Sequence, residues 1–574
     1  MRKLLIFLKD YKKETILGPL FKLLEASFEL FVPLVIASMI DRGIAMQDSG
    51  YIVKMCLLLV LLCFVGFGCA VTAQFFAAKA AAGFAARVKR ALFDNIQKLS
   101  YTDIDRVGTS AMITRMSSDI NQVQQGVNLT IRLLLRSPFV VFGAMVMAFT
   151  ISARQALVFL VTIILLFLVV YLIMRWSIPR YGEIQRGLDK LLALTRENHS
   201  GVRVIRAFGL ESEEKERFGS ENERQMKLQS FVGSVTALMN PVTYGILNLS
   251  VAFLIYRGAV LVNSGDLTQG QVVALYNYMS QILVELIKFA NLILTVTKAI
   301  ASGNRVEELL EMKSSMKDGS VTTFKKTPDH IVFDNVSMRY EGSSADSLEG
   351  LSIRIKRGER IGVIGGTGSG KSTLINLIPR FYDVREGSLL IDGVDVREYR
   401  LEDLRERIGI VPQKAVLFHG TIRDNLKWGR KEATDDELNE ALRIAQAKEI
   451  VDGKQKGLDE MVAQGGTNFS GGQKQRLTIA RALVKKPEIL ILDDSASALD
   501  YLTDKKLREA ISEMDNPPTT FIVSQRPSSV LNCDRIIVLD DGRVEGIGTS
   551  DELLDSCETY REIYDSQYKK EGAV

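Results

Sequence analysis

Two segments in the second half of the sequence carry residue types that bind phosphate and metal. The first reads Gly365-Gly366-Thr367-Gly368-Ser369-Gly370-Lys371-Ser372 and fits the phosphate-loop pattern G-x-x-x-x-G-K-[ST]. Glycines in this pattern let backbone N–H groups approach phosphate oxygens at a helix N-terminus, where the helix dipole also favours anions. We expect Lys371 to reach the β- and γ-phosphates of a nucleotide and Ser372 to bind Mg²⁺.

The second segment places two carboxylates at the end of an apolar run. Ile489-Leu490-Ile491-Leu492 is followed directly by Asp493 and Asp494. Such a short run predicts a buried parallel strand, and open α/β sheets place their chemistry at the C-terminal ends of these strands. Asp493 is therefore the expected carboxylate on the Mg²⁺ side of the site.

These motifs, with Phe469-Ser470-Gly471-Gly472-Gln473 between them, resemble the nucleotide-binding domain of ATP-binding-cassette (ABC) transporters. The resemblance implies an ATPase in which each site combines the phosphate loop of one domain with the signature Ser470–Gln473 of another. It also implies that Tyr340 stacks on adenine, although an ordinary strand tyrosine is the alternative, and that Gln413 senses Mg²⁺ or water. The implied nucleotide contacts are Tyr340, Gly365, Gly366, Thr367, Gly368, Ser369, Gly370, Lys371, Ser372, Thr373, Ser470, Gly471, Gly472 and Gln473. The implied metal contacts are Ser372, Gln413 and Asp493. The implied catalytic residues are Lys371, Gln413, Asp494 and Gln525.

Two residues depart from the family pattern in one composite site. Asp494 stands where members that hydrolyse ATP well have glutamate, and Gln525 stands where they have histidine. Aspartate is one methylene shorter, which retracts its carboxylate by roughly 1.5 Å, and a misplacement near 1 Å can slow a reaction on the order of 100-fold. Glutamine forms hydrogen bonds but carries no charge at neutral pH. With its intact signature, this chain resembles the degenerate-site subunit of heterodimeric bacterial multidrug exporters.

The composition shows that much of the chain is not an ordinary soluble domain. The 574 residues are enough for several domains, 47% of them are hydrophobic, and the mean hydropathy is +0.10. A net charge of only +4 argues against a dedicated nucleic-acid binder. The apolar excess lies before residue 305, so we expect it to form membrane spans.

Six apolar segments are long enough to cross a bilayer. Basic residues precede the first segment and are concentrated in the connections 79–128 and 177–230, so the positive-inside bias puts both termini and both connections in the cytoplasm. The prediction is an all-α transmembrane domain at 1–304, a polar linker at 305–330 and an α/β P-loop NTPase domain of ABC type at 331–574. The predicted spans lie near 16–40, 52–78, 130–152, 154–176, 233–262 and 271–300.

The two long connections keep helical periodicity without being apolar enough to span. We interpret them as membrane helices that continue into the cytoplasm and are joined by short transverse helices, a layout that ABC exporters share. The transverse helices are expected near Tyr101–Asp103 and Arg206–Gly209, with a solvated loop as the alternative. Pro241 is expected to kink the fifth span.

Several charged residues lie inside the predicted spans, where they are costly unless they are paired or face water. Glu285 and Lys288 have the i, i+3 spacing of a pair on one helix, and they either pair internally or face a watery cavity. Glu25 and Glu29 lie one turn apart and either line a cavity or accept hydrogen bonds from Lys22. The sequence leaves both alternatives open.

The leading functional prediction is ATP-driven export of amphipathic or lipophilic compounds across the plasma membrane. The expected partner is a second, non-identical half-transporter that carries the glutamate and the histidine missing here, and no nucleic-acid partner is expected. A homodimeric exporter that tolerates Asp494 and Gln525 is one alternative. An ATP-binding regulatory membrane subunit with little transport is the other.

Overall fold

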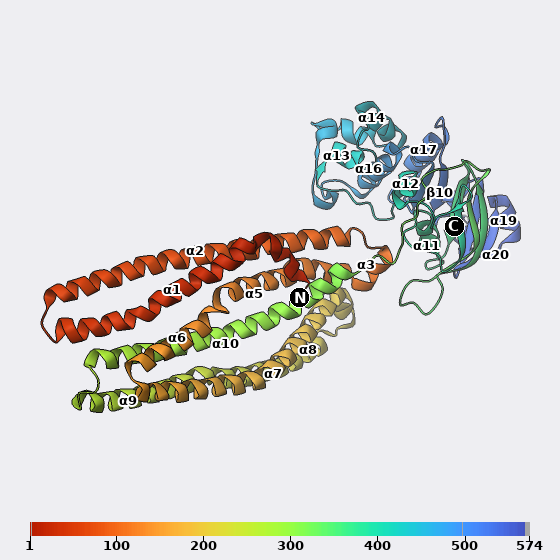
Figure 1. Cartoon of the computed structure of the whole chain (residues 1–574). Coiled ribbons are helices and arrows are strands. Elements are labelled where there is room, and N and C mark those ends of the chain that lie inside the picture. Colours follow the sequence, from red (N-terminus) through yellow and green to blue (C-terminus); the bar gives the residue numbers. More distant parts are fainter. Residues whose placement is uncertain (2, 496, 569–574) are drawn as a thin grey trace. The chain divides into compact units, whose positions relative to one another are not determined.

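The computed structural model describes Met1, residues 3–495 and residues 497–568. The chain forms two compact units, the first of which comprises Met1–Gln97 and Ser110–Met312. The second comprises Lys98–Thr109 and the chain from Lys313 onward (Figure 1). Residues 569–574, the end of the predicted nucleotide-binding domain, lie outside the described residues.

The first unit contains six helical stretches that are long and apolar enough to cross a membrane, as predicted. Each matches one predicted apolar segment, and most run well beyond it because the long connections are helical too. The elements are η1 Leu4–Tyr11, α1 Lys12–Ser38, η2 Met39–Ile44, α2 Ser49–Ile96, α4 Thr109–Thr114, η3 Arg115–Asp119, α5 Ile120–Leu133, α6 Arg136–Ile151, α7 Ala153–Phe208, α8 Glu211–Ala237, α9 Met239–Asn263 and α10 Gln269–Glu311.

Two of the interruptions in the long stretches lie just before a proline. A proline lacks the N–H group and its ring clashes with the carbonyl four residues earlier. The predicted kink at Pro241 is confirmed, since α8 ends at Ala237 and α9 begins at Met239. Pro138 likewise lies four residues after Leu134, at which the helix is interrupted between α5 and α6.

The first long connection, 79–128, contains the predicted transverse helix, and the second, 177–230, does not. Helix α3 covers Tyr101–Val107 and starts at Ser100, whose side chain forms a capping box with Asp103. In the second connection α7 continues to Phe208, and Gly209, at φ 65°, ends it in the left-handed conformation. Helix α8 follows at once with an acidic first turn, which its dipole favours, so no residues are left for a separate helix.

Helix α10 continues into the segment that was predicted to be linker. The helix reaches Glu311, and its last turns are stabilised because Val306 and Leu309 are fully buried and Arg305 binds Asp119 through two N–H groups at 2.9 and 2.5 Å. The Asn95 side-chain amide on α2 then donates to two carbonyls at the end of α10, at 2.9 and 3.0 Å. These bonds satisfy carbonyl groups that a helix end leaves without a partner.

The second unit is built on two larger sheets and a two-stranded one, as the predicted α/β class requires. A four-stranded sheet has the order β2-β1-β4-β5, and a six-stranded sheet has the order β12-β11-β3-β10-β9-β6. Five strands of the six-stranded sheet are parallel, and β12 is the antiparallel edge. The strands are β1 Asp329–Met338, β2 Leu348–Lys356, β3 Arg360–Gly365, β4 Glu386–Ile391, β5 Val394–Asp395, β6 Ile408–Val411, β7 Gly420–Thr421, β8 Met461–Val462, β9 Ile489–Asp493, β10 Thr519–Val523, β11 Arg535–Asp540 and β12 Arg543–Gly548.

The predicted strand Ile489–Leu492 is confirmed as β9, whose four apolar residues are buried. Burial on both faces explains why this strand is a continuous apolar run. The helices of this unit are α11 Lys371–Leu377, α12 Leu401–Glu406, α13 Ile422–Lys427, α14 Asp435–Ile444, α15 Lys448–Asp452, α16 Gly471–Val484, α17 Tyr501–Ser512, α18 Pro527–Val530, α19 Ser550–Ser556 and α20 Glu558–Tyr568. Helices α13 and α14 pack on α16, and α16 contacts β6.

Candidate nucleotide-binding site

Four neighbouring parallel strands bring the predicted site residues to one edge of the six-stranded sheet. Val523 of β10 pairs with Val363 of β3 and with Asp493 of β9, and β6 lies beside β9. Parallel strands end at the same edge, so the residues that follow them converge. They surround a cavity of about 380 Å³ lined by Tyr340, Ser347, Thr367, Gly368, Gly370, Lys371, Ser372, Thr373, Gln413, Asp493, Asp494, Val523, Ser524 and Gln525.

The phosphate loop joins β3 to α11 and requires glycine for steric reasons. Gly370 has φ 96°, and a Cβ there would lie 2.7 Å from the Ser347 carbonyl oxygen. The Lys371 ammonium donates to the carbonyl oxygens of Gly365 and Gly366 at 3.0 and 2.5 Å, and to Ser369 Oγ at 3.2 Å. Burial lowers the pKa of Lys371 because the charged form loses hydration. A phosphate beside this ammonium would restore the lost electrostatic stabilisation.

Oxygen ligands suited to a magnesium ion lie opposite the loop. Ser372 Oγ is 3.4 Å from the nearer carboxylate oxygen of Asp493. Burial, assisted by the neighbouring charge of Asp494, raises the pKa of Asp493. A buried carboxylate that lacks full compensation favours a cation, and hydroxyl and carboxylate oxygens are the ligand types that Mg²⁺ takes. Ser372 and Asp493 therefore fit the ion.

The three polar groups predicted to act on water lie together in this cavity. Asp494 follows β9 in the left-handed conformation, at φ 44°, which aspartate tolerates better than most residues. Its backbone N–H donates to the Val523 carbonyl at 3.0 Å, which fixes the turn. Gln413 Nε2 donates to Asp494 Oδ2 at 3.3 Å, and Gln525 lines the same cavity.

Tyr340 belongs to an aromatic group that reaches α3. Its hydroxyl lies 3.2 Å from Thr373 Oγ1, and its ring meets the Tyr382 ring edge-on at 5.0 Å between centroids. The Tyr382 hydroxyl donates to Asp105 of α3 at 2.8 Å, and the ring of Tyr101, also on α3, lies 6.1 Å from that of Tyr382. Sequence reasoning missed Tyr382, because its partners are far away in the chain and no motif marks it.

The signature residues lie outside this cavity. Ser470 caps α16, since its hydroxyl accepts from the Gln473 N–H at 3.3 Å while its own N–H donates to Gln473 Oε1 at 3.0 Å. A Cβ on Gly472 would lie 2.9 Å from the Ala498 carbonyl oxygen. A Cβ on Gly471 would enter open space among the described residues. The chain thus separates its signature from its own phosphate loop.

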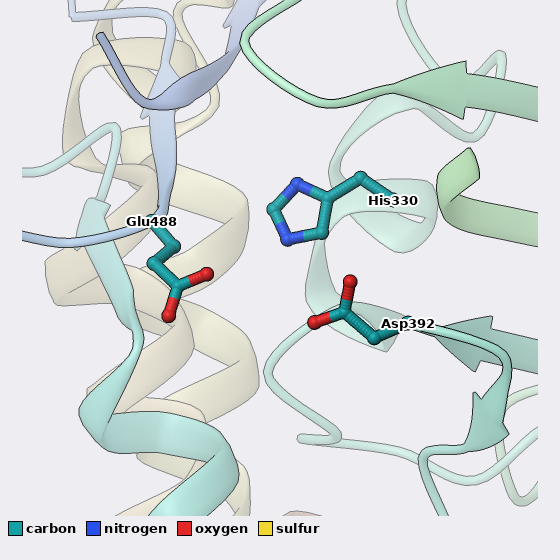
Figure 2. A group of neighbouring side chains, drawn as sticks. All are labelled: His330, Asp392 and Glu488. Carbon is teal, nitrogen blue, oxygen red and sulfur yellow. The ribbon is translucent and has the colours of Figure 1, made fainter. Parts of the chain in front are cut away.

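A second group of side chains has the residue types of a metal site but is an ion-pair network. Figure 2 shows the imidazole of His330 facing the carboxylates of Asp392 and Glu488. Both carboxylates also bind Arg357 and Arg407, with the Arg407 bonds at 2.6 Å to Asp392 and 2.7 Å to Glu488. The hydrogen bonds from Arg407, which dominate those from Arg357, lower the pKa of Glu488 to about 2. Guanidinium groups therefore neutralise both acids, and the network ties the four-stranded sheet to the six-stranded one.

The membrane unit contains an ionic cluster that sequence reasoning identified only in part. Glu285 accepts from Lys288 at 2.9 Å, so the predicted i, i+3 pair is present. Arg136 lies between two acids, donating to Glu285 at 2.5 Å and to Glu29 at 2.7 Å. Lys22 donates to Glu25 at 2.5 Å, as one of the two alternatives predicted. Arg136 was missed, although an arginine inside the third apolar segment is itself a signal that an acidic partner exists.

The fold and the nucleotide cavity together define an ATP-binding-cassette protein with its membrane domain on the same chain. Residues 15–286 match the model of the ABC transporter transmembrane region, and residues 348–497 match that of the ABC transporter domain. An uncharacterized ABC transporter ATP-binding protein of Bacillus subtilis (strain 168), YfiB, is 36% identical over 573 residues, covering 100% of both chains. The chain belongs to the ABC transporter family.

Two further comparisons agree with this assignment. The ATP-dependent lipid A-core flippase of Syntrophus aciditrophicus (strain SB) is 30% identical over 495 residues, covering 85% of this chain and 81% of the flippase. The structure of a bacterial Atm1-family ABC exporter with ATP bound has the same fold, with a TM-score of 0.79 and 24% identity over 97% of this chain and 98% of the other. The protein is an integral membrane ATPase that couples ATP hydrolysis to transport.

Proposed function

We propose that this chain exports amphipathic or lipophilic compounds as one half of a heterodimer in which its own ATP site is slow. One observation carries the proposal. Asp494 and Gln525, the two departures from the family pattern, line the same cavity as Lys371 and Asp493. The signature Ser470–Gln473 lies outside that cavity and keeps the family pattern. The two ATP sites of the dimer therefore receive unequal parts from this chain.

Nucleotide binding needs only the residues that are intact. Tyr340 offers its ring to adenine, and the loop Gly365–Thr373 directs backbone N–H groups at the phosphates. Lys371 exchanges its three bonds to loop oxygens for bonds to the β- and γ-phosphates. Ser372 and Asp493 hold Mg²⁺, which neutralises charge on the phosphate oxygens when bound. This chain therefore binds ATP even where it hydrolyses it slowly.

Hydrolysis at this site suffers from both substitutions. Asp494 must orient the attacking water, but its carboxylate is one methylene shorter than the usual glutamate and lies against Gln413 Nε2 at 3.3 Å. Gln525 donates a hydrogen bond to the γ-phosphate region but places no positive charge there. Both effects weaken the positioning and the electrostatic stabilisation that phosphoryl transfer depends on.

The partner supplies what this chain lacks. It is a second, non-identical half-transporter that carries glutamate and histidine at the positions of Asp494 and Gln525. Its phosphate loop pairs with Ser470–Gln473 of this chain to form the fast site. ATP held in the slow site keeps the nucleotide-binding domains in contact between cycles, so binding at one site is coupled to turnover at the other.

The substrate class and direction rest on the membrane half. The fused spans leave large apolar surfaces, and a relative that is 30% identical is named as an ATP-dependent lipid A-core flippase. The basic residues before the first span and in the long connections support a cytoplasmic position for these parts. The proposed location of the chain is the plasma membrane. Export then runs from the cytoplasm or the inner leaflet outward.

Vesicle transport tests this proposal. Inside-out vesicles that hold the chain with its copurified partner should accumulate a fluorescent lipophilic dye when ATP is added. Vesicles with this chain alone should hydrolyse little ATP and accumulate little dye, while ATPase as high as that of the pair would identify a homodimer instead. Dye uptake by right-side-out vesicles driven by internal ATP would reverse the direction.

A further inference from the structure

An open cleft of about 480 Å³ lies between α7 and α9, which run side by side in the membrane unit (Figure 1). The cleft lies near the start of α7, which follows Ser152, and near the end of α9 at Asn263. The orientation in the proposed function puts this end outside the cytoplasm, and the inference below rests on that orientation.

The outer part of the cleft is cationic and has unused hydrogen-bonding capacity. Arg154 lies in the first turn of α7, and Arg257 lies within two turns of the end of α9. Neither guanidinium forms an ion pair with any residue that the structure describes, in contrast to Arg136 of the ionic cluster. Between them, Gln155 is only 2% exposed and its side-chain Nε2 has no hydrogen-bond partner among the described residues. A buried donor without a partner is costly, so a ligand atom that accepts from it would be favoured.

The deeper part of the cleft is apolar, and the residue spacing explains this division. On α7, Leu157 and Val161 follow Arg154 at intervals of three and four residues. On α9, Phe253 and Leu249 precede Arg257 at intervals of four. Residues at these spacings share one helix face, so each helix presents an arginine at its outer end and apolar side chains deeper in the membrane. These four apolar side chains are more than half exposed and suit contact with hydrocarbon.

We propose that this cleft binds an anionic phospholipid of the outer leaflet. Arg154 and Arg257 contact the phosphate, and the Gln155 amide donates to an oxygen of the glycerol ester region. An acyl chain lies along the two apolar faces. The order of the groups supports a lipid over a soluble phosphate compound, because a soluble compound would leave the apolar half of the cleft without a partner.

Lipid-selective fluorescence quenching tests the site in the full chain without ATP. The chain has two tryptophans, so Phe253→Trp in a Trp176→Phe, Trp428→Phe background gives one reporter inside the cleft. The variant is reconstituted into phosphatidylcholine vesicles containing either dibrominated phosphatidylglycerol or dibrominated phosphatidylcholine at equal mole fraction. Because phosphatidylglycerol has a net negative charge and phosphatidylcholine is a zwitterion, two arginines should give an apparent preference for phosphatidylglycerol on the order of tenfold.

Substitutions separate the cleft from general surface charge. Arg154→Gln with Arg257→Gln should reduce the preference to about one. Arg42→Gln is the matched control, since Arg42 is an exposed arginine on η2, near the connection from the first to the second membrane stretch, and does not line the cleft. That variant should keep the full preference. ATP photolabelling checks that each variant is folded.

Three results would overturn the proposal. Equal quenching by both brominated lipids would show that the cleft does not select an anionic headgroup. Quenching by neither would show that another protein chain covers this face. Displacement of the brominated phosphatidylglycerol by glycerol phosphate in solution would assign the arginines to a soluble ligand. Because the assay uses no ATP and no partner, failed dye export with intact lipid selectivity would refute the proposed function alone.

Discussion

The buried His330 makes the stability of the nucleotide-binding unit depend on pH. Its side chain is fully buried, and Nδ1 lies 2.7 Å from Thr519 Oγ1. Burial, with the positive charges of Arg357 and Arg407 outweighing the nearby acids Asp392 and Glu488, lowers the pKa of His330 from 6.5 to about 4. The folded unit therefore holds a neutral imidazole over a range in which the unfolded chain would be protonated.

The sign and size of the effect follow from this difference in pKa. Between pH 4 and 6.5 the unfolded state binds more protons at this residue, so the free energy of unfolding falls as the pH falls through this range. Above 6.5 the contribution is fully present. At 1.36 kcal/mol per pH unit, the loss is about 2 kcal/mol at pH 5 and about 3 kcal/mol at pH 4. Glu488, whose pKa is lowered from 4.5 to about 2, loses its own contribution only below pH 4.5, so it does not affect a comparison between pH 7 and 5.

Urea unfolding measures this loss in the full chain. Trp428 stacks on Phe418 in the nucleotide-binding unit, so with Trp176→Phe its fluorescence reports the unfolding of that unit. His330→Gln can still hydrogen-bond Thr519 but does not titrate, so its unfolding free energy should lose about 2 kcal/mol less between pH 7 and 5. The exposed His419→Gln in the same unit is the control and should behave like the unaltered chain. Equal pH dependence in the His330 variant and the unaltered chain would refute the reasoning.

Three further predictions address the site and the membrane cluster. Lys371→Ala should abolish labelling of this chain by a photoreactive ATP analogue, because the buried ammonium that faces the phosphates is gone; unchanged labelling would contradict its role. Asp494→Glu with Gln525→His should raise the rate of single-turnover hydrolysis in this chain's own site on the order of 100-fold. An unchanged rate would mean that these two residues do not limit hydrolysis there. Arg136→Gln should lower the free energy of unfolding by about 1–3 kcal/mol, because the Glu285 carboxylate loses its 2.5 Å partner but keeps Lys288 at 2.9 Å. Adding Glu285→Gln should recover part of the loss, and simple additivity of the two changes would argue against an interaction between the two residues.

The features that the sequence predicts well are those encoded by local spacing. The phosphate loop, the apolar strand before Asp493 and the six spans each depend on residues within one short window, and the structure contains them. Pro241 interrupts the fifth span because its effect acts on the residue four positions earlier. Local chemistry of this kind needs no knowledge of the distant chain.

Features that depend on distant partners escaped prediction. Arg136 meets Glu285 across 149 positions of sequence, and Tyr382 meets Asp105 across 277. No spacing rule relates such residues, since only the packing of their helices and strands brings them together. The expected helix near Arg206–Gly209 failed for another reason, because periodicity does not distinguish a short transverse helix from the last turns of a long one.

The most direct test of the unequal ATP sites compares two substitutions in the reconstituted pair. Asp494→Ala removes a carboxylate that is already badly placed, so steady-state ATPase should fall only modestly. Replacement of the partner's glutamate should remove most of the turnover. If Asp494→Ala lowers turnover as severely as the change in the partner, this chain's own site drives the cycle and the account is contradicted.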